Sequence, residues 1–239
     1  MLARYAALTG AALDRPSWRG AWPLEAVLAA IRPNTGLVAA VSPNNPTGGI
    51  VSIDAVRAVS AAAPDSAVLV DLAYGDFAEQ DLAADSLRLP NAIVAGSLSK
   101  SWGLPGLRVG WAIATPAVAA VLRAAGHPYA VSSPSLALAA AALDAGPALR
   151  DAHVAQVRHE RERLLQVLLS MDVAAQPSHA NFVFGRSERA GRLRDGLAAR
   201  GIAIRIWPGS PDLGDALRIT CPGEPAAFER LMAALEDLR

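Results

Sequence analysis

Cysteine is almost absent from this sequence of 239 residues, which contains only Cys221. A single cysteine excludes a framework of internal disulfide bonds, and scarce cysteine is typical of a reducing compartment. We interpret Cys221 as a small thiol of the core. The cysteine content therefore favours a cytoplasmic protein.

The sequence also lacks an excess of charge and a long apolar run. Lys and Arg total 22, Asp and Glu total 22, and the formal net charge is zero. Without a concentrated basic face we expect no nucleic-acid partner. No stretch approaches the roughly 18 apolar residues of a membrane span, and residues 1–12 lack the pattern of an export signal. We therefore expect no membrane partner, and we predict no metal site.

Lysine is the scarcest charged residue, because among the 22 basic side chains only Lys100 is not an arginine. Arginine stays charged at any accessible pH and is a poor nucleophile. A desolvated lysine amine can instead lose its proton and condense with an aldehyde to form a Schiff base. One lysine can also persist by chance on a solvated face, so the meaning of Lys100 depends on its neighbours.

Short apolar runs alternate with longer Ala-rich segments in the first part of the chain. This alternation predicts an α/β fold, with a mostly parallel sheet flanked by helices. The predicted strands are Leu37–Ser42, Val68–Asp71, Ala92–Ser97 and Val109–Ile113. The predicted helices are Ile53–Ala63 and Pro116–Ala125. Ser52 is the expected N-cap of the first helix.

From about Gly146 the pattern changes, and it predicts a smaller C-terminal α+β domain. A connecting helix is followed by the order βαββα. The predicted segments are Ala148–Leu169, Asn181–Gly185, Glu188–Arg200, Ile202–Ile206, Ala216–Thr220 and Pro225–Leu238. We therefore expect two domains, at residues 1–146 and 147–239.

Polar residues follow three of the predicted strands, at the sheet edge where open parallel sheets bind ligands. Residues 43–48 follow the first strand, Asp71 and then Tyr74 the second, and Ser97 and then Lys100 the third. Each has an ordinary structural explanation: a turn for residues 43–48, a helix cap for Asp71 and a core position for Tyr74. Their combination with Lys100 predicts one crevice that holds a functional site.

Four motifs occur in the order and at the spacing of one enzyme family: Pro43–Gly48, Asp71–Tyr74, Ser97–Lys100 and Gly106–Gly110. Two later motifs, Pro177–Phe182 and Leu213–Thr220, resemble small-domain segments of one branch of that family. Through these motifs the chain resembles the fold-type I pyridoxal-phosphate-dependent aminotransferases of class I/II, and most of all the histidinol-phosphate aminotransferase branch. The resemblance covers essentially the whole chain. It implies that residues 1–146 are an incomplete cofactor-binding large domain, because the N-terminal third of the longer family members is missing.

The resemblance implies pyridoxal 5'-phosphate as the cofactor, bound in the predicted crevice. Lys100 would form the Schiff base and then act as the base that moves the substrate proton. Asp71 would lie against the pyridine nitrogen and keep the ring protonated. The other implied cofactor contacts are Asn45 and Tyr74 at the ring oxygen, and Ser97 and Arg108 at the phosphate.

Two arginines of the second domain are the implied substrate ligands. Arg218 would bind the α-carboxylate as a bidentate pair. Arg205 would bind a second anion such as a phosphate, or it is an exposed arginine on an edge strand. We assign no role to His127 or His179, for which a packed or hydrogen-bonded position is the simpler interpretation.

The implied activity is amino-group transfer between an amino acid or histidinol phosphate and a 2-oxo acid, catalysed by a cytoplasmic homodimer of amino-acid biosynthesis. Two alternatives stay open. A threonine-phosphate decarboxylase would use the same cofactor contacts, and a truncated, non-catalytic remnant would keep only the fold. The retained lysine favours an enzyme, because a drifting arginine-biased chain has no reason to keep an amine.

Overall fold

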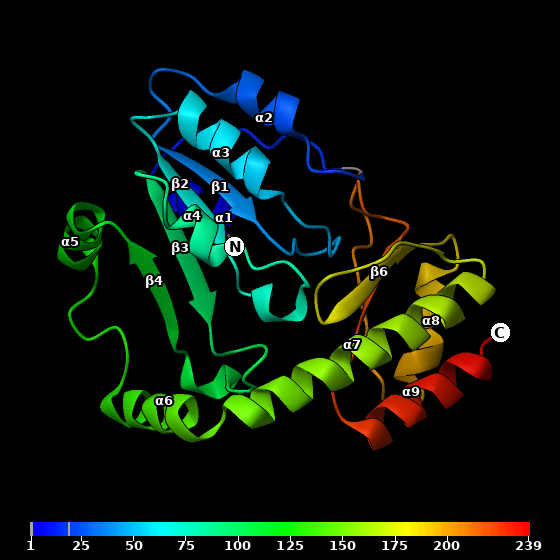
Figure 1. The fold of residues 1–239 in the computed structure, drawn as a ribbon. Coiled ribbons are helices and arrows are strands. Elements are labelled where there is room, and N and C mark those ends of the chain that lie inside the picture. The colour runs from blue at the N-terminus through cyan, green and yellow to red at the C-terminus, as the bar shows by residue number, and fades with distance from the viewer. Residues whose placement is uncertain (1, 19) are drawn as a thin grey trace.

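Two four-stranded sheets form the framework of the protein in a computed structural model that describes residues 2–18 and 20–239. The long helix α7 (Pro147–Ser170) runs from the first sheet to the second (Figure 1). The first sheet with its helices has the α/β class that the sequence predicts. No helix in the described ranges combines the length and the apolar character that crossing a membrane requires.

The first sheet has the strand order β1-β2-β3-β4. Strands β1, β2 and β3 are parallel, and β4 is antiparallel to β3. Their bounds are Leu37–Val41, Ala67–Asp71, Ala92–Ser97 and Gly110–Ala114. Each strand ends within one residue of its predicted bounds, because valine-rich and isoleucine-rich runs fit a pleated, buried surface.

Alternation along the strands decides which side chains reach the site. Val68 and Val70 are completely buried under helices on one face, whereas Asp71 lies on the opposite face. The register pairs Asp71 with Ala95, so Ser97 two residues later shares the face of Asp71. A carboxylate and a hydroxyl group therefore end neighbouring strands on the same face.

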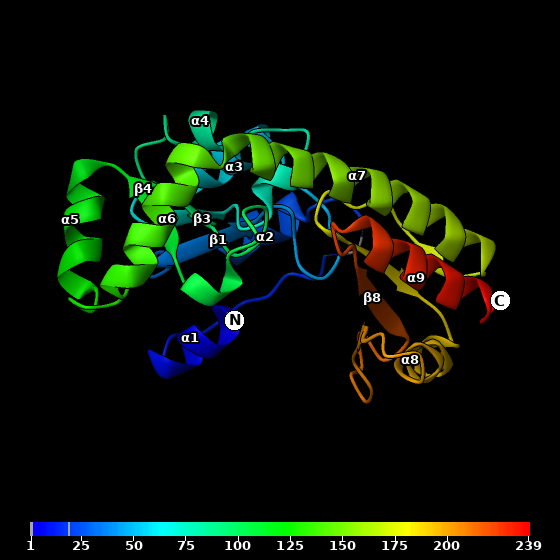
Figure 2. The same ribbon diagram turned by 90° about the horizontal axis from the view of Figure 1, so that it is seen from below.

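Three helices cover the face of the first sheet that carries Val68 and Val70. They are α2 (Leu24–Ala30), α3 (Ile53–Ala62) and α4 (Ala83–Ser86). Ser52 caps α3 as predicted, since its Oγ accepts the N–H of Ala55 at 3.2 Å. Helix α1 (Leu2–Leu8) lies on the opposite side of the sheet (Figure 2). The sheet edges are less covered, and Leu37 and Ile113 are 51% and 49% exposed.

Two helices connect the first sheet to α7. Helix α5 (Pro116–Ala125) has its predicted bounds. Helix α6 (Ser133–Ala145) is not among the predicted elements, although Ser132 caps it by accepting the N–H of Ser135 at 3.2 Å. The run of serine and proline before an alanine-rich segment is the signal that could have revealed it.

The second sheet is antiparallel, with the order β5-β6-β8-β7. Its strands are β5 (Ala174–Ala175), β6 (Phe182–Arg186), β7 (Arg205–Ile206) and β8 (Ala216–Thr220), with helices α8 (Ala190–Ala198) and α9 (Pro225–Glu236). This matches the predicted βαββα order with one added short strand. Strand β7 is shorter than predicted, because Ile202 instead closes α8 by donating its N–H to Leu197 at 2.9 Å.

The core of the second sheet reaches into the first part of the chain. It includes Leu164 and Leu168 of α7, and also Tyr74 and Phe77 from the segment after β2. Phe77 ends the short 3-10 helix η1 (Gly75–Phe77) and is fully buried. The domain boundary at residues 146 and 147 stays a prediction, because this core draws on both sides of it.

Candidate active site

The turn after β3 holds Lys100 at the carboxyl end of the first sheet. It is closed by two backbone hydrogen bonds, from Leu104 to Leu98 at 3.0 Å and from Gly103 to Lys100 at 3.1 Å. Leu98 is buried and anchors the turn. Ser101 donates a short hydrogen bond to Asp76, which ties this turn to the segment after β2. Lys100 is therefore half-buried on a fixed turn.

Four predicted site residues lie together beyond the strand ends. The Lys100 amine lies 5.3 Å from the ring centre of Tyr74. Asn45 donates from Nδ2 to the Tyr74 hydroxyl at 3.5 Å and accepts a hydrogen bond from Arg218 at 2.6 Å. We call Asn45, Tyr74, Lys100 and Arg218 the site cluster. It joins the loops after three parallel strands to β8 of the second sheet.

Arg218 is held in the site cluster by an aromatic ring. Its guanidinium carbon lies 4.8 Å from the ring centre of Phe182, and that ring packs edge-on against Tyr74 at 5.4 Å. Burial lowers the pKa of Arg218; the attraction of Tyr74 opposes this, and the nearby charge of Arg205 adds to it. Sequence reasoning did not single out Phe182, although an aromatic residue two positions before the β-strand partner of Arg218 shares its face.

The Nε of Arg218 is buried and has no hydrogen-bond partner in the part of the chain that the structure describes. A buried donor without a partner is unfavourable. A carboxylate can satisfy two donors of one guanidinium at once. Arg218 is therefore suited to bind a carboxylate.

Asp71 and Ser97 are half-buried at the ends of β2 and β3. One carboxylate oxygen of Asp71 accepts the N–H of Ala73 at 3.0 Å, and the Ser97 hydroxyl accepts the N–H of Ser99 at 3.1 Å. These local bonds hold each side chain at its strand end. Among the described residues, no side-chain hydrogen bond joins either of them to the site cluster.

The remaining two predicted arginines flank the site without a direct hydrogen bond to the cluster in the described chain. Arg108 is exposed and has a left-handed backbone, with φ at 56°. It lies two residues before Gly110, the strand partner of Ser97. Arg205 is exposed, is paired in register with Arg218, and lies 5.6 Å from the ring centre of Trp207. The two histidines have other partners: His127 accepts the N–H of Tyr129 at 3.1 Å, and His179 contacts Glu79 at 2.7 Å.

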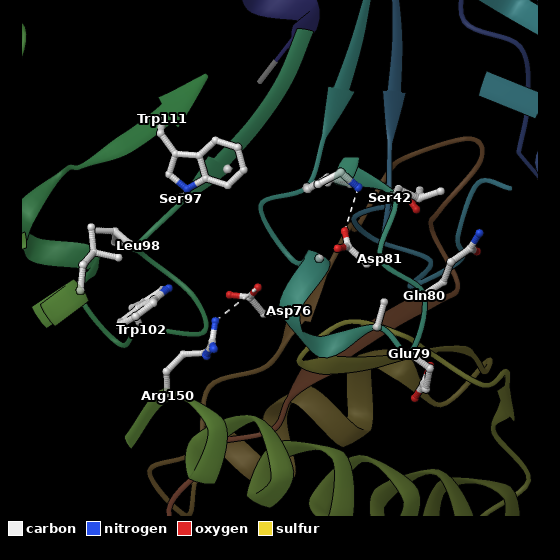
Figure 3. Close-up of a pocket in the computed structure, with 17 residues that line it drawn as sticks. Ser42, Asp76, Glu79, Gln80, Asp81, Ser97, Leu98, Trp102, Trp111 and Arg150 are labelled. Atoms are coloured by element: carbon white, nitrogen blue, oxygen red, sulfur yellow. Dashed lines mark hydrogen bonds and ion pairs between the residues drawn. The ribbon is translucent and has the colours of Figure 1, made fainter. Parts of the chain in front are cut away.

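A cavity of about 470 Å³ lies beside the site, and Figure 3 shows its lining. Of the predicted site residues only Ser97 lines it. Trp111 also lines it. The Trp111 ring lies over Gly96, on the face of the sheet opposite to Asp71 and Ser97. The candidate site is therefore the cluster at the strand ends and not this cavity.

The fold and this cluster define a class of protein. The family model for aminotransferase class I and II matches residues 9–235. The chain therefore belongs to the aminotransferase class I and II family.

A more specific similarity is to histidinol-phosphate aminotransferases. The chain is 38% identical over 216 residues to the enzyme of that name from Xanthomonas oryzae pv. oryzae (strain MAFF 311018), covering 88% of this chain and 59% of the relative. The chain thus spans about three fifths of the length of that relative. Residues 9–235, which the family model matches, contain the site cluster and both sheets.

Solved structures have the same fold. The histidinol-phosphate aminotransferase from Sinorhizobium meliloti, in complex with pyridoxal-5'-phosphate, superposes with a TM-score of 0.85 at 26% identity, over 99% of this chain and 68% of that chain. The L-threonine-O-3-phosphate decarboxylase from Porphyromonas gingivalis gives 0.75 at 24% identity, over 91% and 69%. The second similarity shows the fold alone.

Proposed function

We propose that this chain carries the catalytic residues of a pyridoxal-phosphate-dependent aminotransferase, with Lys100 as the residue that binds the cofactor covalently. The observation that supports this most is the convergence of the single lysine with Tyr74, Asn45 and Arg218 beyond the carboxyl ends of three parallel strands. The family membership and the name of the Xanthomonas relative support the same activity.

The donor set fits pyridoxal phosphate. When bound, the cofactor supplies an aldehyde and a ring that accepts electrons. Lys100 has the amine that such an aldehyde needs, and Asp71 has the carboxylate that keeps a pyridine nitrogen protonated. Asn45 and Tyr74 offer donors to the ring oxygen. Ser97 at the end of β3 and Arg108, two residues before β4, would bind the phosphate.

The proposed substrate carries a carboxylate or a phosphate. Arg218 would bind the α-carboxylate of an amino acid through its NH2 and the unpartnered Nε. Arg205 on the neighbouring strand would bind a phosphate, such as that of histidinol phosphate, a donor without a carboxylate. The Lys100 amine would also hold the proton that leaves the α-carbon of the substrate.

An assay of amino-group transfer tests this function. The purified chain with pyridoxal phosphate is given histidinol phosphate, an aromatic amino acid or threonine phosphate with a 2-oxo acid, and the new amino acid is measured. We expect transfer from histidinol phosphate, and loss of both transfer and the visible cofactor band in Lys100→Ala. Release of carbon dioxide from threonine phosphate without transfer would instead support the decarboxylase. If neither product forms and no cofactor band is visible, the result would favour the non-catalytic remnant.

We propose further that the chain acts as a homodimer. The partly exposed sheet edges at Leu37 and Ile113 leave apolar surface available for association. Sedimentation of the purified protein at several concentrations tests this, and a monomer at all concentrations would contradict it.

A further inference from the structure

Arg161 of helix α7 connects the two segments that carry the aromatic residues of the site. It is 6% exposed. Its NH1 donates to the carbonyl oxygens of Phe77 at 3.2 Å and Ala180 at 3.1 Å, and its NH2 donates to Glu79 at 3.1 Å. One guanidinium thus joins the segment after β2 to the segment before β6.

The acceptors of Arg161 are close in sequence to the site cluster. Phe77 ends η1, whose N-cap is Tyr74. Ala180 lies two residues before Phe182, the ring that supports Arg218. Because Tyr74 and Phe182 pack edge-on at 5.4 Å, a fixed spacing between their segments also fixes their rings.

Neighbouring contacts extend this connection to the loop that carries Asn45. His179 contacts Glu79 at 2.7 Å through its ring, and its backbone N–H donates to Gly48 at 2.8 Å. Arg158, one turn earlier on α7, donates to the carbonyl oxygen of Phe77 at 3.1 Å. The segment around residue 48 therefore contacts the segment around residue 180, and α7 binds that segment and the one around residue 77.

An arginine suits this position for a geometric reason. Its planar guanidinium directs several donors along fixed directions, whereas the amine of a lysine is a single point on a flexible stem. Three acceptors from two segments determine the distance between those segments. A buried apolar side chain would fill the volume but would leave the carbonyl oxygens of Phe77 and Ala180 without this donor.

We propose that Arg161 is a positioning residue, which acts through Tyr74 and Phe182 to place the site cluster and does not touch the substrate. Only the expected effect on enzyme kinetics rests on the proposed function. Its structural consequence, a fixed spacing of the segments around residues 77 and 180, concerns the cofactor-free chain as well.

The test compares Arg161→Gln and Arg161→Lys with the control Arg163→Gln. Arg163 lies on the same helix, is partly exposed and pairs with Glu229 at 2.6 Å, away from the site. In cofactor-free protein we expect faster hydrogen exchange in residues 74–80 and 178–182 in Arg161→Gln, a smaller change in Arg161→Lys, and no change there in the control.

In the loaded enzyme we expect Arg161→Gln to raise KM for an amino-acid donor about tenfold with a smaller change in kcat, because Arg218 loses its alignment. The pH at which the visible cofactor band changes should also shift, because Tyr74 lies at the proposed position of the ring oxygen. If Arg161→Gln does not fold, Glu79→Gln removes one exposed acceptor of the network and should move both readouts in the same direction.

Unchanged KM, cofactor band and hydrogen exchange in a folded Arg161→Gln or Glu79→Gln would overturn the proposal. Equal changes in Arg163→Gln would overturn it too, because they would indicate general destabilisation of α7. If the unmodified chain transfers no amino group, the proposed function fails, and the hydrogen-exchange comparison still decides whether Arg161 fixes the two segments.

Discussion

Arg218 gains its proposed role from its surroundings. The aromatic ring of Phe182 lies against the Arg218 guanidinium, and Asn45 accepts a hydrogen bond from it. Its buried Nε still has no partner among the described residues. An unsatisfied buried donor costs about 1–3 kcal/mol. A carboxylate that satisfies this donor recovers part of that cost, so the residue favours an anionic substrate.

We expect Arg218→Ala to raise KM for an amino-acid donor, which carries the α-carboxylate, about 10- to 100-fold, since a hydrogen bond to a charged group contributes about 1.5–3 kcal/mol. The dissociation constant of pyridoxal phosphate, measured by absorbance, should change far less. Arg186→Ala is a matched control, because Arg186 is an arginine of the neighbouring strand that pairs with Asp215. Equal weakening of donor and cofactor binding in Arg218→Ala would argue against a carboxylate ligand.

The contacts of Glu79 with Arg161 and His179 make the stability of the fold depend on pH. Burial raises the pKa of its carboxyl group, but the hydrogen bond to His179 and the attraction of Arg161 outweigh burial, so the pKa lies below the usual 4.5. A carboxyl group with a lowered pKa in the folded state stabilises the fold above pH 4.5. This contribution disappears as the pH falls below that value.

We therefore expect Glu79→Gln to lower Tm at pH 6 and to lose less Tm than the unmodified chain between pH 5 and pH 3.5. Thermal unfolding followed by circular dichroism at several pH values measures this. Glu162→Gln, which changes an exposed carboxylate of α7, is the control. Parallel pH profiles for Glu79→Gln and the unmodified chain would contradict the assignment.

Among the elements, the loop that carries Asn45 depends on one close contact with the second half of the chain. Gly48 has a positive φ of 75°, and a Cβ atom at this position would lie 2.1 Å from the Oγ of Ser178. Both the backbone conformation and the space require glycine here. This contact sets the loop after β1 against the segment that precedes β6.

We expect Gly48→Ala to lower the free energy of unfolding by more than the roughly 1 to 2 kcal/mol of a left-handed alanine, and to weaken cofactor binding. Gly103→Ala is the matched control, because Gly103 has a similar φ of 65° and a Cβ atom there would meet nothing within 4 Å. Urea unfolding of both variants separates the cost of the left-handed backbone from the cost of the clash with Ser178. A loss in Gly48→Ala no larger than in Gly103→Ala would show that Ser178 does not restrict this loop.

The strands of the first sheet were predictable because each is a short apolar run followed by polar residues. Helix α6 and strand β5 were not. Strand β5 consists of two alanines, Ala174 and Ala175, which become a strand only by pairing with residues 185 and 186. The strand propensity of two alanines does not indicate such a pairing.

At the scale of the whole molecule, the site depends on contacts between segments far apart in the sequence. Asn45 and Arg218 are 173 positions apart, and Glu79 and His179 are 100 positions apart. The sequence predicted the residues at the strand ends, since their chemistry follows from residue type. It did not predict Arg161 or Phe182, because their roles come from the packing of α7 and β6 against η1.

The central claim, a covalent bond between Lys100 and pyridoxal phosphate, can be tested by reductive trapping. Borohydride reduction of the loaded protein, followed by digestion and mass spectrometry, should place one pyridoxyl group on the peptide that contains Lys100. Lys100→Arg, which keeps the positive charge without the amine, should take up none. A pyridoxyl group on the α-amino group instead of Lys100, or equal labelling of Lys100→Arg, would contradict the account.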